Sequence, residues 1–283
     1  MDANNWTDGN IKNVIVISDE AGTENSEILA YGLLVIEQEK FAQFVNTIRL
    51  IKEKHGCDKP IHYRNLPDSI ISSRTKTAID WLKSILVESV KDFSFLYLEI
   101  HLKHKHFENE RFSEGNHLYN RFYRSAINCI LHSKYKKKNL NIKWVLHHKE
   151  EYGNSSNDPF TKKEYLTEMI KKADVNPLSI EVSERSDIGE EDFAYALQFV
   201  DLLLSSTHNC IHSNSSKPGK FRVSQMASEI FDRNQKLWPV QARKCSYSRF
   251  PSETKEFINI SKTKIAPLYY DAPETNTSLK KWF

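Results

Sequence analysis

Two acidic residues that lie far apart in the sequence occupy positions where a carboxylate could do chemistry. The first, Asp19, ends an almost continuous apolar run, KNVIVIS, which is typical of a strand buried on both faces. Catalytic and ligand-binding groups collect at strand ends in α/β sheets, although an Asp there can equally stabilise the turn that follows. Glu20 comes next, and because side chains alternate along a strand, it should point away from Asp19.

The second acid, Asp201, lies in the middle of DFAYALQFVDLLLSS, a run so apolar that it predicts a helix buried on nearly every side. Gln198 precedes Asp201 by three residues and shares its helix face. A buried carboxylate needs a partner, which can be a cation, a set of hydrogen-bond donors or a metal ion. Asp201 is therefore either a functional carboxylate or a structural one that pairs with an Arg or caps a neighbouring helix.

One acid at the end of a strand and one on a late helix form the arrangement that two-metal phosphoryl-transfer sites need. Carboxylates bind hard divalent ions, which activate water and neutralise the leaving phosphate oxygen. Asp19 and Asp201 therefore predict a site for Mg²⁺ or Mn²⁺. Whether the two residues meet depends on the fold, because their spacing in the sequence does not bring them together.

The elements that must position these acids alternate along the chain. We expect strands at 12–19, 27–36, 93–102, 140–148 and 177–182, and helices at about 39–54, 70–90, 116–134, 161–174, 190–207 and 222–236. The first two strands predict an antiparallel hairpin, and the alternation after them predicts a mixed α/β sheet, parallel where helices intervene. Residues 213–220 are typical of a linker or surface loop. We expect one α/β domain over 10–210, with a C-terminal extension over 211–283 packed on it.

The composition predicts a soluble globular protein. A chain of 283 residues with 39% hydrophobic side chains can bury a substantial core, and its net charge of +3 is compatible with nucleic acid without requiring it. The four cysteines are widely spaced, which argues against a disulfide framework or a cysteine-based zinc site. Without a signal peptide or an apolar run of the ~20 residues that span a bilayer, we expect a cytoplasmic protein with no membrane contact. The sequence leaves the oligomeric state open.

Three short motifs, taken in order, resemble the bacterial family catalogued as domain of unknown function 3800 (DUF3800). The first strand runs into Asp19-Glu20-Ala21-Gly22, which resembles the family's Asp-Glu-Ser-Gly opening. Ile61 to Leu66 resembles its Ile-His-aromatic-basic-x-Leu element, and Leu197 to Leu202 resembles its Leu-Gln-x-x-Asp-Leu helix. The matches span about residues 12–206.

This resemblance implies a ribonuclease H-like fold, in which a mixed sheet begins with a hairpin, is flanked by helices and carries acids on the first strand and a late helix. It implies metal-dependent cleavage of nucleic acid. Asp19 and Asp201 would then be the principal metal ligands, and His62 would orient or protonate the substrate. Gln198 would support the site.

The chain also departs from the family pattern. Pro60 stands where an acid is common, and the fourth strand leads into His147 where an Asp is usual. Glu20, His147 or Glu150 could complete the metal shell, since a neutral histidine can bind Mn²⁺ or act as a general base. These departures keep open an alternative function, a catalytically inactive ribonuclease H-like module that binds nucleic acid or a protein partner.

Several basic residues could contact the phosphates of a bound nucleic acid. A basic tract precedes the fourth predicted strand, and without nucleic acid it would be an ordinary solvated helix end. The predicted contact residues are Arg64, Lys136, Lys137, Lys138 and Lys149.

Overall fold

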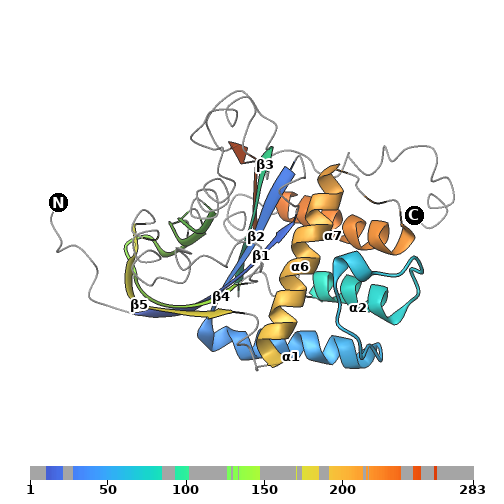
Figure 1. Ribbon diagram of the computed structural model, residues 1–283, viewed down its shortest axis with the longest axis horizontal. Coiled ribbons are helices and arrows are strands. Elements are labelled where there is room, and N and C mark those ends of the chain that lie inside the picture. The colour runs from blue at the N-terminus through green and yellow to red at the C-terminus, as the bar shows by residue number, and fades with distance from the viewer. Residues whose placement is uncertain are drawn as a thin grey trace, which may run out of the picture.

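The computed structural model shows an α/β molecule built on one twisted sheet (Figure 1). It describes residues 11–21, 28–84, 93–101, 126–128, 130–132, 134–146, 170, 174–184, 191–212, 215, 217–236, 245–249 and 258–259. The predicted helix at 161–174 and the end of the predicted helix at 70–90 lie largely outside these residues. Every structural statement below concerns the described residues.

The sheet has the strand order β5-β4-β1-β2-β3-β6-β7. Its strands are β1 (Lys12–Ala21), β2 (Ile28–Glu37), β3 (Phe93–His101), β4 (Asn139–Leu146), β5 (Asn176–Glu184), β6 (Cys245–Arg249) and β7 (Ile258–Asn259). The pairs β1–β2 and β2–β3 are antiparallel, whereas β4 runs parallel to β1 and β5 runs parallel to β4. The predicted hairpin and mixed sheet are therefore confirmed, with β1 between β4 and β2.

Both faces of β1 are buried from Val14 to Ser18, which explains the continuous apolar run of this strand. Ile15 and Ile17 belong to the main core cluster, under helices α1 (Gln38–Lys54), α2 (Ser73–Leu82) and α6 (Glu191–His212). Val14 and Val16 are equally buried and alternate to the opposite face, on the side of the helical residues 126–128, 130–132 and 134–135 (Figure 1). A half-exposed strand would instead have alternated between apolar and polar residues.

Helix α6 packs closely on β2 of the sheet and also contacts α1 through aromatic rings. A Cβ on Gly32 of β2 would lie 2.9 Å from Leu204 Cβ, so the absence of a side chain at position 32 lets α6 approach the sheet. Nearer the start of α6, the Phe193 ring stacks on Phe41 of α1 with centroids 4.8 Å apart, and Phe199 meets Phe44 edge-on at 5.3 Å. These contacts fix the height and the rotation of α6 above β1 and β2.

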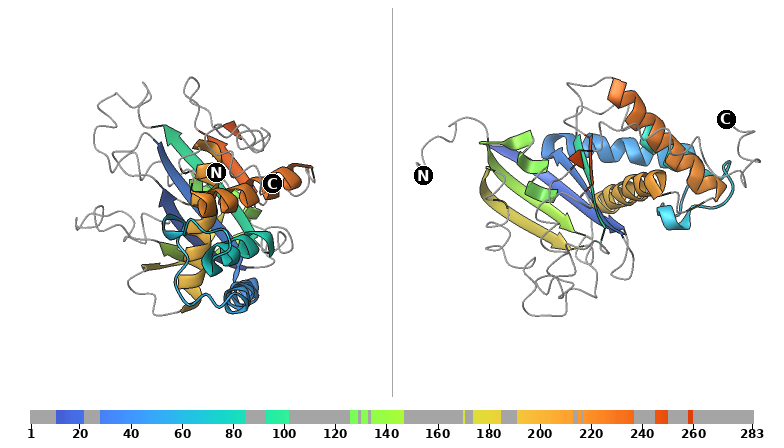
Figure 2. Two further views of the ribbon diagram at one scale, coloured as in Figure 1. Left: turned by 90° about the vertical axis from the view of Figure 1, so that its right-hand side faces the viewer. Right: turned by 90° about the horizontal axis from the view of Figure 1, so that it is seen from above.

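The segment predicted as a linker at 213–220 is instead partly helical. Helix α7 (Pro218–Lys236) begins inside it and packs on α6 and α2 (Figure 2, right). Pro218 suits a first helical position because its missing N–H has no partner there in any case. A Cβ on Gly219 would lie 2.0 Å from the Pro67 carbonyl oxygen, so this glycine is required by contact with another segment. The loop was predicted because Pro218 and Gly219 are typical loop residues.

The boundaries predicted for the two parts of the chain stay a prediction. Helix α6 runs to His212, two residues beyond the proposed division at residue 210. Beyond it, α7 packs on α2 and α6, and β6 pairs with β3.

Candidate functional site

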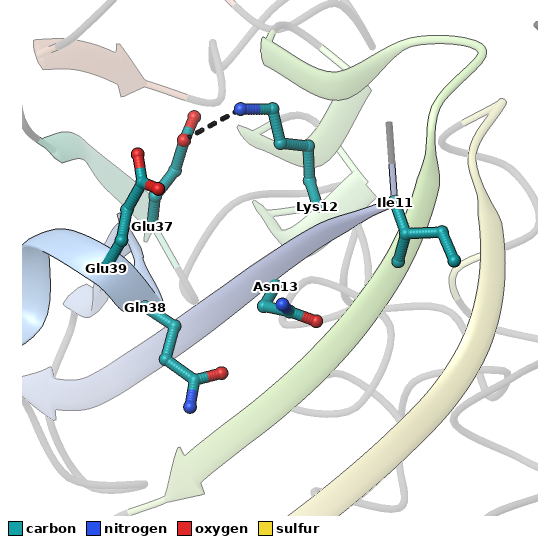
Figure 3. A pocket seen from close by; sticks show the side chains of 6 residues that line it. All are labelled: Ile11, Lys12, Asn13, Glu37, Gln38 and Glu39. Carbon is teal, nitrogen blue, oxygen red and sulfur yellow. Dashed lines mark hydrogen bonds and ion pairs between the residues drawn. The ribbon is translucent and has the colours of Figure 1, made fainter. Parts of the chain in front are cut away.

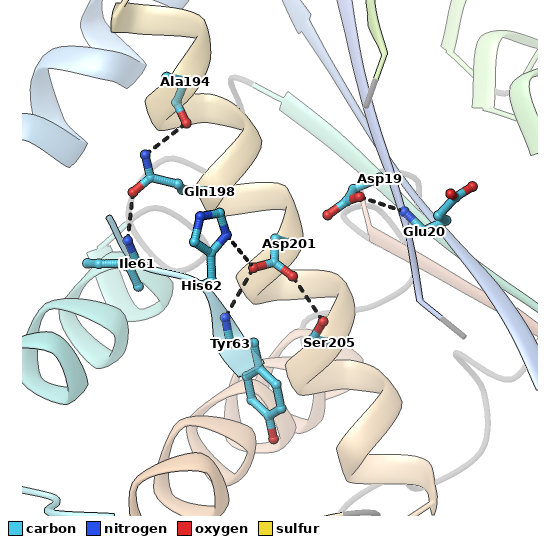
Figure 4. Close-up of polar contacts among 9 residues, drawn as sticks. All are labelled: Asp19, Glu20, Ile61, His62, Tyr63, Ala194, Gln198, Asp201 and Ser205. Carbon is cyan, nitrogen blue, oxygen red and sulfur yellow. Dashed lines mark hydrogen bonds and ion pairs between the residues drawn. The ribbon is translucent and has the colours of Figure 1, made fainter. Parts of the chain in front are cut away.

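Asp19 is near the end of β1 on the face that carries α6. It is paired across the sheet with Gly32, and Gly32 is paired with Tyr97 of β3, so the three residues form one row under the helix. The Asp19 carboxylate points from the strand toward α6 and accepts a hydrogen bond from the Glu20 amide at 2.9 Å (Figure 4). A carboxylate at this position faces the helix that carries the second acid.

Asp201 projects from α6 toward η1 (Tyr63–Asn65), a single 3-10 turn, and is held there by several donors. Its Oδ2 atom accepts the Tyr63 amide at 3.1 Å and lies 3.3 Å from a ring nitrogen of His62 (Figure 4). Its Oδ1 atom accepts the Ser205 hydroxyl at 3.2 Å. The side chain is 21% exposed, so the carboxylate is sheltered yet reachable. The structure therefore supplies the set of donors that a carboxylate in an apolar helix requires.

Gln198 and Asp201 together bind the backbone of the segment that leads into η1. Gln198 Oε1 accepts the Ile61 amide at 2.8 Å, and Gln198 Nε2 donates to the Ala194 carbonyl oxygen at 3.2 Å. His62 between the two bound amides is extended, with φ −119° and ψ 136°, so the amides of Ile61 and Tyr63 point to the same side. Two acceptors three residues apart on a helix thus match two donors two residues apart on an extended chain. This match is a physical reason for the two motifs to occur together.

Further polar groups continue along α6 at the spacing of one helix face. Ser205 lies one turn after Asp201 on α6, and His208 lies two turns after Asp201. A ring nitrogen of His208 lies 2.8 Å from the hydroxyl of Tyr97, the residue at the end of the row that begins with Asp19. An interface that is otherwise apolar therefore carries a polar strip between α6 and the sheet.

Glu20 lies apart from this strip. It is paired with Tyr31 and alternates to the opposite face of the sheet, and both of its carboxylate oxygens are shielded from solvent. A role for Glu20 beside Asp19 as a metal ligand stays a prediction that this alternation does not favour.

The remaining predicted ligands are not placed. His147 and Glu150 lie outside the described residues, as does Lys149. Among the residues that the structure describes, no group of three or more His, Cys, Asp or Glu side chains is close enough to hold a metal ion. The described part of the candidate site therefore consists of Asp19 on β1, Asp201 on α6 and His62 just before η1.

The structure separates the predicted basic tract from the carboxylates. Lys136, Lys137 and Lys138 lie just before β4, whose first residues pair with Lys12 at the beginning of β1. Asp19 follows Lys12 by seven residues, which is about 23 Å of strand. Arg64, in contrast, is exposed on η1, two residues after His62. Of the described basic residues predicted to bind nucleic acid, Arg64 lies at the same end of the sheet as Asp19.

A cavity of about 380 Å³ also lies at the beginning of β1, away from Asp19 and Asp201 (Figure 3). It is lined by Ile11, Lys12, Asn13, Glu37, Gln38 and Glu39. The Lys12 ammonium lies 3.0 Å from Glu37 across it, so two of its charges already neutralise each other. This hollow and the polar strip are at opposite ends of the central strand.

Sequence reasoning missed one charged residue beside the site. Lys220, in the first turn of α7, has its ammonium 5.5 Å from the centre of the Tyr63 ring. Its segment reads as a loop, and no periodicity connects position 220 with position 63. Ser205 could have been found, because it lies one turn after Asp201 on the same helix face.

Comparison with known proteins leaves the family open. No family model matches the chain, and no curated protein matches it. A search of solved structures finds the crystal structure of the ribonuclease H2 from Pyrococcus horikoshii OT3, with 11% identity, 92% of this chain and 100% of that chain covered, and a TM-score of 0.39. A TM-score at this level does not establish a common fold. Membership of the DUF3800 family stays a prediction.

No helix in the described part of the chain is both long enough and apolar enough to cross a bilayer.

Proposed function

We propose that this chain is a divalent-metal-dependent phosphodiesterase that cleaves nucleic acid, built on a ribonuclease H-like fold. The fold proposal is supported by a mixed sheet that begins with the β1–β2 hairpin, is flanked by helices and has one acid on its first strand and one on a late helix. The observation that carries the functional proposal is the placement of Asp19. It lies near the end of β1 and points at the helix from which Asp201 projects (Figure 4).

The two carboxylates suit a hard divalent ion. Mg²⁺ is commonly bound through one or two carboxylates, with water and substrate phosphate as its other ligands. Asp19 and Asp201 would supply those carboxylates, and such an ion would activate water and neutralise charge on the leaving oxygen. His147 and Glu150 stay proposed additional ligands.

The surrounding residues would hold Asp201 ready for this role. Its Oδ2 atom is fixed by the Tyr63 amide, while its Oδ1 atom is engaged by Ser205, a hydroxyl that can rotate away. His62 lies against Asp201 and could orient a phosphate or donate a proton to a leaving oxygen. Gln198 would act through the backbone, because it binds the Ile61 amide and so fixes the position of the neighbouring His62.

The test is the exchange of Asp19 for Asn. We expect Asp19→Asn to lower Mn²⁺-dependent cleavage by about 100-fold or more, or about 2.7 kcal/mol of transition-state stabilisation. The substrates are single-stranded and duplex DNA, single-stranded RNA and an RNA–DNA hybrid. Asp68→Asn is the matched control, because that carboxylate is 67% exposed and its ion pair is with Lys217 at 3.7 Å. Equal cleavage by the wild type and the Asp19 variant would overturn the proposal.

A second candidate is a binding module of the same fold without catalysis. It is favoured by the environment of Asp201, whose two oxygens already accept the Tyr63 amide and the Ser205 hydroxyl, an arrangement that explains the residue without a metal. Calorimetric titration with Mn²⁺ separates the two functions. The nuclease should bind the ion and lose that binding in Asp19→Asn, whereas the inactive module should bind nucleic acid with no dependence on Mn²⁺.

A further inference from the structure

Lys220, in the first turn of α7, lies over the ring of Tyr63. The Tyr63 amide binds Asp201 at 3.1 Å, and the face of the Tyr63 ring receives the Lys220 ammonium at 5.5 Å from its centre. A cation over an aromatic face is attracted by the ring quadrupole, which restrains a long side chain without neutralising its charge. One residue thus places a carboxylate and an ammonium group in the same region.

The backbone that carries Lys220 is held firmly by contacts with other segments. Gly219 lies against the Pro67 carbonyl oxygen closely enough that no side chain fits there. The Tyr63 hydroxyl lies 2.7 Å from Ser224 Oγ and also donates to the Lys220 carbonyl oxygen at 3.4 Å. Asn209 of α6 donates to Ser224 Oγ at 3.1 Å. The start of α7 is therefore fixed relative to both Tyr63 and α6.

Among the residues that the structure describes, several influence the charge of Lys220, but none forms an ion pair with it. Burial and the nearby Lys217 ammonium lower the pKa of Lys220, while the Asp68 and Asp201 carboxylates raise it by a smaller amount. Lys217 forms an ion pair with Asp68 at 3.7 Å, whereas Lys220 forms none within the described part of the chain. Keeping a partly buried ammonium group without a direct counter-ion is unfavourable for stability. Such a group is suited to meet an incoming anion.

We propose that Lys220 binds a backbone phosphate of a nucleic acid that lies across the surface of η1 and the start of α7, next to the phosphate at Asp19 and Asp201. Lysine suits this role because its ammonium group is a compact charge that does not require the planar geometry of arginine. The contact carries no base specificity and would position the strand. The inference rests on the proposed nucleic-acid function but not on catalysis.

The experiment measures how salt weakens oligonucleotide binding. Fluorescence anisotropy of a labelled single-stranded DNA and a labelled RNA is recorded in EDTA, between about 50 and 200 mM KCl, for the wild type and variants. Lys220→Met should weaken binding several-fold and reduce the slope of log K against log salt by about 0.7, the value for one phosphate contact on a single strand. Lys220→Arg, which keeps the charge, should restore most of the slope.

The matched control is Lys52→Met. Lys52 also lies over a tyrosine ring, with its ammonium 5.0 Å from the centre of Tyr195, nearly two helical turns before Asp201 on α6. Its loss removes the same charge and the same kind of contact but should leave the slope unchanged. Three results would each overturn the inference. The slope could be equal for the wild type and Lys220→Met, the slope could fall as much in Lys52→Met as in Lys220→Met, or the wild type could fail to bind the oligonucleotides. A slope change without any Mn²⁺-dependent cleavage would support Lys220 and reject the nuclease.

Discussion

The end of β1 and the middle of α6 each carry one of the two acids, but the two carboxylates are held differently. Asp19 accepts a hydrogen bond from the next amide of its own strand, whereas Asp201 accepts an amide that is 138 residues away in the sequence. Asp201 therefore connects α6 to η1 and has a structural role whatever else it does. The contrast teaches that a change at Asp201 must alter stability as well as any chemistry, because it removes a contact between distant segments.

The largest effect on stability that tests this contrast is expected from Asp201→Ala. It leaves the Tyr63 amide without its acceptor, and an unsatisfied buried donor costs about 1–3 kcal/mol. Ser205→Ala is the matched control, because it removes one donor to Oδ1 and leaves the Tyr63 bond intact, at a cost of about 1 kcal/mol or less. Urea denaturation measures both. A smaller loss in Asp201→Ala than in Ser205→Ala would contradict the structural role of Asp201.

Gly32→Ala should break the alignment of the two regions without touching either carboxylate. The new Cβ would lie 2.9 Å from Leu204 Cβ, and overpacking of this kind costs about 1–3 kcal/mol. Since α6 must move away from β2, cleavage should fall as well, although Asp19 and Asp201 are both present. Combining Gly32→Ala with Leu204→Ala should cost less than the sum of the two single changes. Strict additivity would show that the two residues are not in contact.

The smallest effect is expected from Asp80→Asn, away from both carboxylates. Burial alone would raise the pKa of Asp80, but hydrogen bonds from His55 and Lys54 outweigh it and lower that pKa below its ordinary value. The stability that Asp80 contributes is thus present above its unfolded-state pKa of about 4 and is lost as the pH falls through the lower folded-state value.

For Asp80, solvent screening limits the effect to about 0.5 kcal/mol. Thermal denaturation of the wild type and Asp80→Asn should differ at pH 7 and converge in acid, with cleavage unaffected. A difference that grew as the pH fell would mean that the direction of this pKa shift is wrong.

Much of the fold could be predicted because local patterns determine it. The apolar run before Asp19 predicted a strand buried on both faces, and the polar turn after it predicted the hairpin that β1 and β2 form. The helix around Asp201 was predicted as buried nearly all round, and the residues on its exposed side are few. The start of α7 was missed, because Pro218 and Gly219 are loop residues by local rules and become helical through their fit against Pro67.

The sequence by itself determined that Asp201 and Gln198 share a helix face, that Asp19 follows a buried apolar run and that Asp201 needs a partner. Periodicity decides these features, because it fixes the direction of each side chain within its own element. The predicted end of the strand at Asp19 was two residues early, because pairing with β2 continues to Ala21. Only the tertiary structure decided that the partners are the amide of Tyr63 and the ring of His62, and that Lys220 lies over Tyr63. A carboxylate is satisfied equally by an arginine, a metal ion or an amide, so its partner is determined by which distant segment the fold brings to it.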